Sequence, residues 1–83
     1  MAKSLRLEDV VRIIDEHVVR TRGGVRVTAD TQLFLEGLVD SFAVAELVGE
    51  LERARGAAFA EGSLVPDDFE SPRTLFARLE ELS

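Results

Sequence analysis

The chain has 83 residues, a formal net charge of −6 at pH 7 and no cysteine. A domain of this length buries a modest core and leaves little room for both a catalytic scaffold and a deep substrate pocket, which argues against an enzyme. The lack of cysteine excludes disulfides, thiolate metal sites and a cysteine nucleophile, and the acidic charge disfavours nucleic acid and anionic lipid while suiting a basic protein partner.

The first predicted element is an amphipathic helix that Ser4 caps and that runs to about Arg20. Apolar residues recur along it at steps of three and four, which places them on one stripe. They are Leu7, Val10, Val11, Ile14 and Val18. Gly23 and Gly24 should end this helix, because paired glycines favour a reversal of the chain.

A long connection over residues 25–39 follows the glycines. Residues 25–27 alternate in the manner of a strand, but three residues cannot carry a sheet. A long loop needs anchors, and we expect four apolar side chains to supply them by packing down: Leu33, Phe34, Leu35 and Leu38. Gly37 permits a turn immediately before the next helix.

The second helix should begin near Asp40 and Ser41, run to about Arg55 and end at Gly56. A stripe of apolar residues at helical spacing is expected to face the core. Its members are Val44, Leu47, Val48 and Leu51.

Two prolines mark the C-terminal elements. Pro66 can begin a short helical turn over residues 66–69, and Ser71 followed by Pro72 is typical of the cap and first position of a helix. This last helix carries apolar residues on one face: Leu75, Phe76, Leu79 and Leu82. The sum is an all-α fold with one domain over residues 1–83, a small three-to-four-helix bundle with a long loop between its first two helices.

These residues offer little from which to build a self-sufficient catalytic site. His17 is the only histidine, and a lone histidine within a helix is more often a surface or core-edge residue than a base. The acidic residues of 67–70 lack the spacing of a calcium loop and better fit the charged start of a helical turn. The arginines of 20–26 have no interleaved aromatics and are predicted to form a solvated face.

The most informative segment is residues 36–42, Glu-Gly-Leu-Val-Asp-Ser-Phe. An isolated Asp-Ser pair at a helix start is usually a cap that accepts bonds from free backbone amides. Here Asp40 and Ser41 are adjacent, so one can cap while the other stays free, and apolar residues flank them on both sides. A long anchored loop leads up to the pair, which is a place where a modified serine can be presented to another protein.

A phosphodiester on Ser41 would be chemically well placed, because the positive end of the helix dipole favours an anion there. The carboxylate of Asp40 could help to hold a divalent cation during transfer, since Mg²⁺ prefers oxygen ligands and bridges to phosphate. We expect no resident metal site.

With this segment the chain resembles the acyl and peptidyl carrier proteins over most of its length. Residues 37–42 look like their modification motif, and the resemblance implies that Ser41 receives 4′-phosphopantetheine. Four further segments match the family's pattern in order: residues 33–34 at the end of the loop, 46–48 in the second helix, 65–67 at the entry to the short third helix, and 71–75 at the start of the last helix.

The Asp-Ser-Phe form of the motif is similar to that of D-alanyl carrier proteins and of stand-alone carriers that load amino acids or other small acids. Ala43 stands where fatty-acid carriers usually have an acidic residue, and Gly49 where they often have a large apolar one. Both departures argue against a role in bulk fatty-acid synthesis. The resemblance therefore implies an aminoacyl cargo first, with a polyketide or fatty acyl cargo as the alternative.

The resemblance also implies a protein with no turnover of its own. A phosphopantetheinyl transferase would move the arm from coenzyme A onto Ser41, with support from Asp40. An adenylating or other acyl-loading enzyme would then charge the arm as a thioester, and downstream condensing or transferring enzymes would take the cargo. Such partners are expected to recognise the loop before Ser41 and the second helix through Leu38, Val39, Phe42, Ala45, Glu46 and Gly49.

Two other classes of function compete with the carrier. One is a helical adaptor that keeps the carrier fold and is never modified; the other is a small enzyme that uses His17 or the acidic residues of 67–70. Residues 1–11 contain no unbroken apolar stretch, so we expect no signal peptide and no membrane span, and place the protein in the cytoplasm. A monomer is the default for a shuttle that must visit several partners.

Overall fold

The computed structural model describes residues 3–24 and 26–82 of the chain. Four helical elements follow one another: α1 (Leu7–Arg22), α2 (Ser41–Arg55), the 3₁₀ turn η1 (Pro66–Phe69) and α3 (Pro72–Glu81). No strand occurs in these two ranges, and the predicted all-α fold is confirmed.

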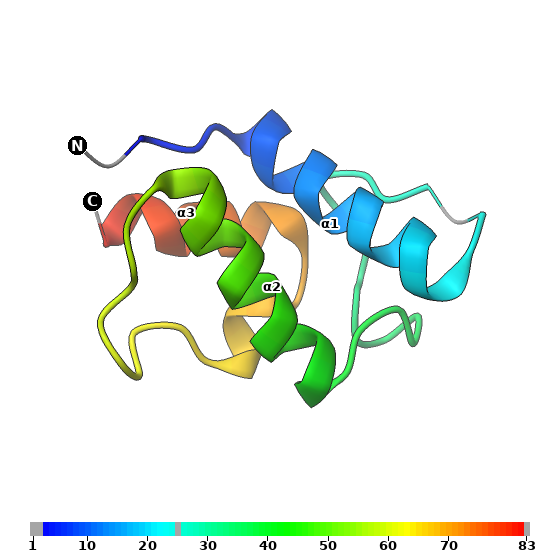
Figure 1. Cartoon of the computed structure of the whole chain (residues 1–83). Helices are drawn as coiled ribbons and strands as arrows, with labels where there is room; N and C mark the ends of the chain where they lie inside the picture. The colour runs from blue at the N-terminus through cyan, green and yellow to red at the C-terminus, as the bar shows by residue number, and fades with distance from the viewer. Residues whose placement is uncertain (1–2, 25, 83) are drawn as a thin grey trace.

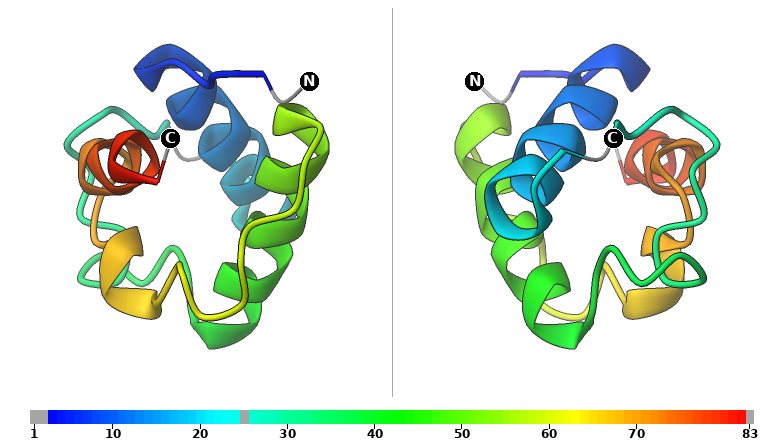
Figure 2. Two further views of the ribbon diagram at one scale, coloured as in Figure 1. Left: turned by 90° about the vertical axis from the view of Figure 1, so that its left-hand side faces the viewer. Right: turned by 90° about the vertical axis from the view of Figure 1, so that its right-hand side faces the viewer.

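The four elements surround one core (Figure 1). α1 packs against both α2 and α3, and η1 contacts the same two helices from the opposite side, as Figure 2 shows. Apolar side chains from every element and from the long loop fill the centre. The largest of them, all below 2% exposure, are Phe69, Ile14, Leu33, Leu47, Leu51 and Leu75.

The start of α1 differs from the prediction. Its cap is Arg6 and not Ser4, because the Arg6 backbone N–H donates to Asp9 Oδ2 at 2.9 Å. A carboxylate three residues inside a helix satisfies a free amide at its start, and the same hydrogen bond lowers the pKa of Asp9 below its ordinary value. The predicted end is confirmed: Gly23, at φ +76°, donates its N–H to the Val19 carbonyl at 3.0 Å.

The long loop between α1 and α2 is tied to the C-terminal part of the chain. Leu33 donates its N–H to the Glu70 carbonyl at 2.9 Å, and the Arg73 N–H donates to the Ala29 carbonyl at 2.9 Å. The Arg73 guanidinium adds two bonds to the Asp30 carboxylate, at 2.8 and 3.2 Å. These contacts fix the route by which the loop reaches the start of α2.

Two of the four predicted loop anchors are buried and two are not. Leu33 and Leu38 are 0% and 7% exposed, whereas Phe34 is 39% and Leu35 is 83% exposed. The cause is a tight turn. The Leu38 N–H donates to the Leu33 carbonyl at 2.9 Å, and Gly37 adopts a φ of +72°. The turn directs its two ends inward and its middle outward, so the prediction that Phe34 and Leu35 pack down is wrong.

The remaining helix boundaries follow the predictions. Gly56 ends α2 in the left-handed conformation at φ +81°, Pro66 begins η1, and the Ser71 hydroxyl accepts the Thr74 N–H at 3.1 Å with Pro72 as the first residue of α3. Among the described residues, none of the helices combines the length and the apolar character needed to cross a membrane.

Candidate functional site

Asp40 and Ser41 divide the two roles that an Asp-Ser pair can play at a helix start. Asp40 is the N-cap of α2: its Oδ1 accepts the Ala43 N–H at 2.8 Å, and its carbonyl accepts the Val44 N–H at 2.9 Å. Ser41 is the first residue of α2 and is exposed, and its hydroxyl bonds to no other described residue. The helix is therefore capped without the serine, whose Oγ is free to react.

The start of α2 suits an anion. The first amides of a helix have no carbonyl partner within the helix. The Asp40 side chain accepts only the amide N–H of Ala43. The amides of Ser41 and Phe42 remain, together with the positive end of the helix dipole. The first turn of α2 contains no acidic residue to oppose an anion there.

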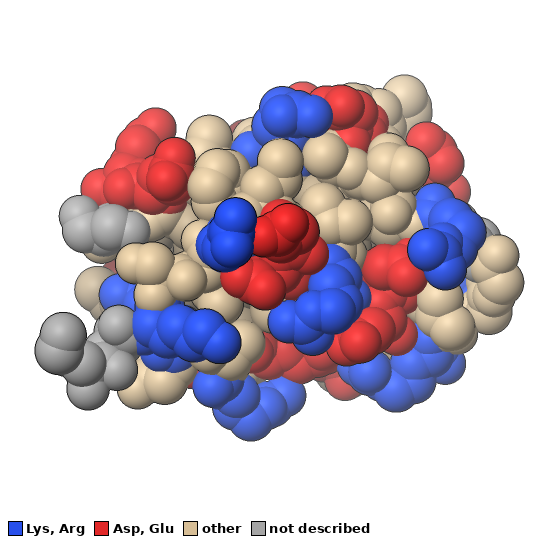
Figure 3. Space-filling view, turned by 90° about the horizontal axis from the view of Figure 1, so that it is seen from above, with Lys and Arg blue, Asp and Glu red and all other residues tan. Residues whose placement is uncertain are grey.

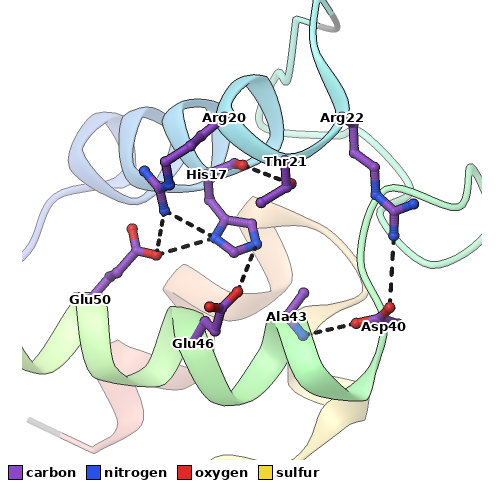
Figure 4. Close-up of polar contacts among 8 residues, drawn as sticks. All are labelled: His17, Arg20, Thr21, Arg22, Asp40, Ala43, Glu46 and Glu50. Atoms are coloured by element: carbon purple, nitrogen blue, oxygen red, sulfur yellow. Dashed lines mark hydrogen bonds and ion pairs between the residues drawn. The ribbon is translucent and has the colours of Figure 1, made fainter.

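A cation from α1 lies beside the cap, as Figure 4 shows. The Arg22 Nη2 is 3.8 Å from Asp40 Oδ2, and the two side chains are 44% and 64% exposed. An exposed pair contributes about 0–1 kcal/mol, so its main effect is to offset the carboxylate next to Ser41. A divalent cation that used this carboxylate during transfer would compete with Arg22 for Oδ2.

The residues predicted to meet partner proteins lie in two environments. Leu38 and Val39 are 7% and 4% exposed, so their side chains support the loop from inside rather than facing another protein. The four α2 residues of the set are exposed or partly exposed: Phe42, Ala45, Glu46 and Gly49. Phe42 is 73% exposed and follows Ser41 directly, which makes it the large apolar group at the site.

Leu35 is a candidate contact that the sequence pattern did not reveal. It is 83% exposed, more than any other large apolar side chain among the described residues. Its position within an apolar run, Leu33 to Leu35, resembles an anchor, and only the turn geometry shows that it points outward. No local signal in the sequence distinguishes the inward leucine from the outward one.

His17 is buried, so of the two expected positions, surface or core edge, the surface is excluded. Its ring is 1% exposed, and Nδ1 lies 3.1 Å from Glu50 Oε2. The same carboxylate oxygen is 2.9 Å from the Arg20 guanidinium, as Figure 4 shows. A ring enclosed in this way cannot reach a substrate as a base, which removes the main residue of the small-enzyme alternative.

The other charged groups singled out in the sequence have structural contacts. Among the acidic residues of 67–70, Asp68 accepts the Val65 N–H at 2.9 Å and so charges the start of η1, as predicted. The arginines at positions 20, 22 and 26 are exposed, as predicted for a solvated face. Arg20 also pairs with Glu50 of α2, and Arg22 pairs with Asp40, the N-cap of α2. Figure 3 shows basic and acidic side chains interspersed over the α1 side of the molecule. No group of three or more potential metal ligands occurs within residues 3–24 and 26–82.

No protein-family model matches the chain. Among curated proteins, the D-alanyl carrier proteins of Bacillus cereus and Bacillus anthracis are each 32% identical to it over 75 residues. These matches cover 90% of this chain and 92% of the relatives. The similarity therefore extends over nearly the full length of both chains and includes the start of α2.

Proposed function

The chain belongs to the carrier-protein family, and from that membership we propose that it is a stand-alone carrier whose Ser41 receives a 4′-phosphopantetheine arm from coenzyme A. Carrier proteins are not themselves enzymes. The observation that carries the proposal is the Ser41 hydroxyl at the first position of α2, which is exposed and bonds to none of the described residues while Asp40 caps the helix.

The residues at the start of α2 fit this modification. In the transfer, Ser41 Oγ bonds to the phosphorus that carries the pantetheine, the bond from that phosphorus to the nucleotide oxygen breaks, adenosine 3′,5′-bisphosphate leaves, and the hydroxyl proton passes to a base of the transferase. The product is an anionic phosphodiester beside the free amides and the positive end of the α2 dipole, where an anion is favoured. When bound, the arm supplies a thiol that holds an acyl or aminoacyl group as a thioester.

The packing between α2, η1 and α3 supports a small cargo. Phe69, Leu47, Leu51 and Leu75 fill this region, and each is 0% exposed. A long acyl chain that entered here would have to displace these side chains, and overfilling a packed core is unfavourable. An aminoacyl group that stays outside the bundle needs no such change, and the relatives are named for a D-alanyl group. We therefore favour an aminoacyl cargo loaded by an adenylating enzyme over a polyketide or fatty acyl cargo.

The partner-facing surface of this proposal is formed by four exposed or partly exposed residues of α2: Phe42, Ala45, Glu46 and Gly49. A phosphopantetheinyl transferase, a loading enzyme and a downstream transferring enzyme would each dock there in turn, with Phe42 as an apolar anchor beside the reacting serine and Glu46 as an acidic contact for basic side chains.

Intact-mass spectrometry after incubation with coenzyme A and a phosphopantetheinyl transferase of broad carrier specificity tests the proposal. We expect the wild type to gain the mass of one phosphopantetheine group and Ser41→Ala to gain none. Ser63→Ala is the matched control, because the Ser63 hydroxyl lies outside the site and donates to the Ala60 carbonyl at 2.7 Å. An unmodified wild type would favour the helical adaptor that is never modified.

A further inference from the structure

A partly buried polar cluster joins the C-terminal half of α1 to α2, next to the proposed partner-facing surface (Figure 4). At its centre, His17 is 1% exposed. Its Nδ1 lies 3.1 Å from Glu50 Oε2, and its Nε2 lies 3.9 Å from Glu46 Oε1. The single imidazole ring therefore has one α2 carboxylate at each of its nitrogens.

The two carboxylates are held to different degrees. Glu50 is 19% exposed and accepts from both the His17 ring and the Arg20 guanidinium, the latter at 2.9 Å. Glu46 is 44% exposed, and its 3.9 Å separation from the ring exceeds hydrogen-bond length. Arg20 thus neutralises the inner carboxylate, whereas the outer carboxylate remains available to a protein outside.

The bond to Glu50 is the shortest polar contact of the buried His17 ring. Burying an unpaired polar group is unfavourable. The Arg20 guanidinium also lies 3.4 Å from Nδ1, farther than Glu50 Oε2 at 3.1 Å. With Nδ1 turned to Glu50 and Arg20, Nε2 is directed at Glu46. The two glutamates also line a shallow cavity of about 650 Å³ together with Ala45, Gly49, Ile13, Arg20 and Arg53. This cavity overlaps the proposed partner-facing surface at three residues: Ala45, Glu46 and Gly49.

We propose that His17 is a positioning residue for partner recognition. His17 lies inside the α1–α2 contact, where it holds the Glu50 side chain. The orientation of its ring also sets the position of the Glu46 carboxylate. A basic side chain of the partner then binds this carboxylate. A helix that does not carry Ser41 thereby shapes the surface through which Ser41 is recognised. This inference rests on the proposed function and adds to it a residue with no contact of its own with the partner.

The test measures KM and kcat for phosphopantetheinyl transfer by one broad-specificity transferase. The concentration of the purified chain is varied at a constant concentration of coenzyme A. Because Glu46 acts at the rim of an interface, we expect His17→Leu to raise KM about three- to fivefold, with kcat within about twofold of the wild type. In His17→Asn, the amide nitrogen replaces Nδ1 as the donor to Glu50, so KM should return towards the wild-type value.

Two controls separate positioning from a purely structural role. Val18→Ala opens the core at a neighbouring α1 residue that is 0% exposed, so it should lower stability and leave KM unchanged while the protein remains folded. His17→Gln places a side-chain amide near the position of Nε2 and loses the bond to Glu50. If His17→Leu does not fold, a higher KM for His17→Gln than for His17→Asn is the expected result.

A double-mutant cycle completes the test. In the Glu46→Gln/Glu50→Gln background, His17→Leu should no longer change KM, because the carboxylates through which it acts are absent. The inference is overturned if His17→Leu leaves KM unchanged, if its effect persists in that background, or if Val18→Ala raises KM equally. A wild-type chain that is not modified at all would overturn the proposed function, and this inference with it.

Discussion

Replacing Asp40 separates the capping role of the side chain from its charge. Asp40→Ala removes the acceptor of the Ala43 N–H, which lies 2.8 Å from Oδ1, and also the partner of Arg22 at 3.8 Å. Asp40→Asn retains an amide oxygen that can accept the same N–H and removes only the negative charge. The backbone bond from the Val44 N–H to the residue 40 carbonyl, 2.9 Å long, is kept in both variants.

The structure sets the relative size of the two effects. Loss of an N-cap costs about 1 kcal/mol, within a range of about 0.5–2 kcal/mol. The carboxylate charge contributes less, because the pair with Arg22 is exposed and salt-screened and contributes about 0–1 kcal/mol, and a charge at a helix start adds about 0.3–1 kcal/mol. We therefore expect Asp40→Ala to lower the free energy of unfolding by about 1–2 kcal/mol and Asp40→Asn by about 0.5 kcal/mol.

Urea unfolding followed by far-UV circular dichroism suits this comparison, since the chain has no Trp or Tyr for fluorescence. Each kcal/mol corresponds to about 4–8 °C in Tm for a domain of this size, so thermal melts provide a second measurement. If Asp40→Asn is as unstable as Asp40→Ala, the charge and not the cap is the stabilising feature, and the assignment of Asp40 as cap is refuted.

Three further predictions concern the fold. Gly49→Ala should stabilise the chain by up to about 1 kcal/mol, whereas Gly56→Ala should destabilise it by about 1 kcal/mol, because Gly49 is within a helix and Gly56 has a φ of +81°; urea midpoints of opposite sign check this. Phe69→Ala should lower the free energy of unfolding by about 3–5 kcal/mol, since the ring is 0% exposed, and an intact cooperative transition at wild-type urea concentrations would contradict it. The hydrogen bond from Arg73 lowers the pKa of Asp30 below 3.8, so Asp30→Asn should be less stable than the wild type at neutral pH, and the difference should vanish as the pH falls through the lowered pKa; a difference that persists in acid argues against the pair.

Much of the helical framework was predictable because its boundaries depend on local chemistry. Gly56 ends α2 and Ser71-Pro72 begins α3 as predicted, since these residues act on the adjacent turn. The predicted start of α1 was wrong because the sequence offers two local caps. Asp9 accepts the amide of Arg6, which places the cap at Arg6 and leaves Ser4 outside the helix.

The long loop and the α1–α2 contact could not be predicted from local patterns. Leu33 and Leu35 are the same residue type two positions apart, yet one is 0% and the other 83% exposed, because a turn decides which side faces the core. His17 meets Glu50 across 33 positions of sequence, and no spacing rule within one helix encodes that contact. The order of family motifs was the stronger signal, and the resemblance to carrier proteins that it indicated is confirmed by the curated relatives.

The central claim is that Ser41 carries the arm, and the most direct test is tandem mass spectrometry of the tryptic peptide 27–53 after treatment with coenzyme A and a phosphopantetheinyl transferase. Ser41 is the only serine in this peptide. We predict that the peptide gains one phosphopantetheine group and that fragment ions place it on Ser41. An unmodified peptide, or a group located on another residue, would contradict the claim.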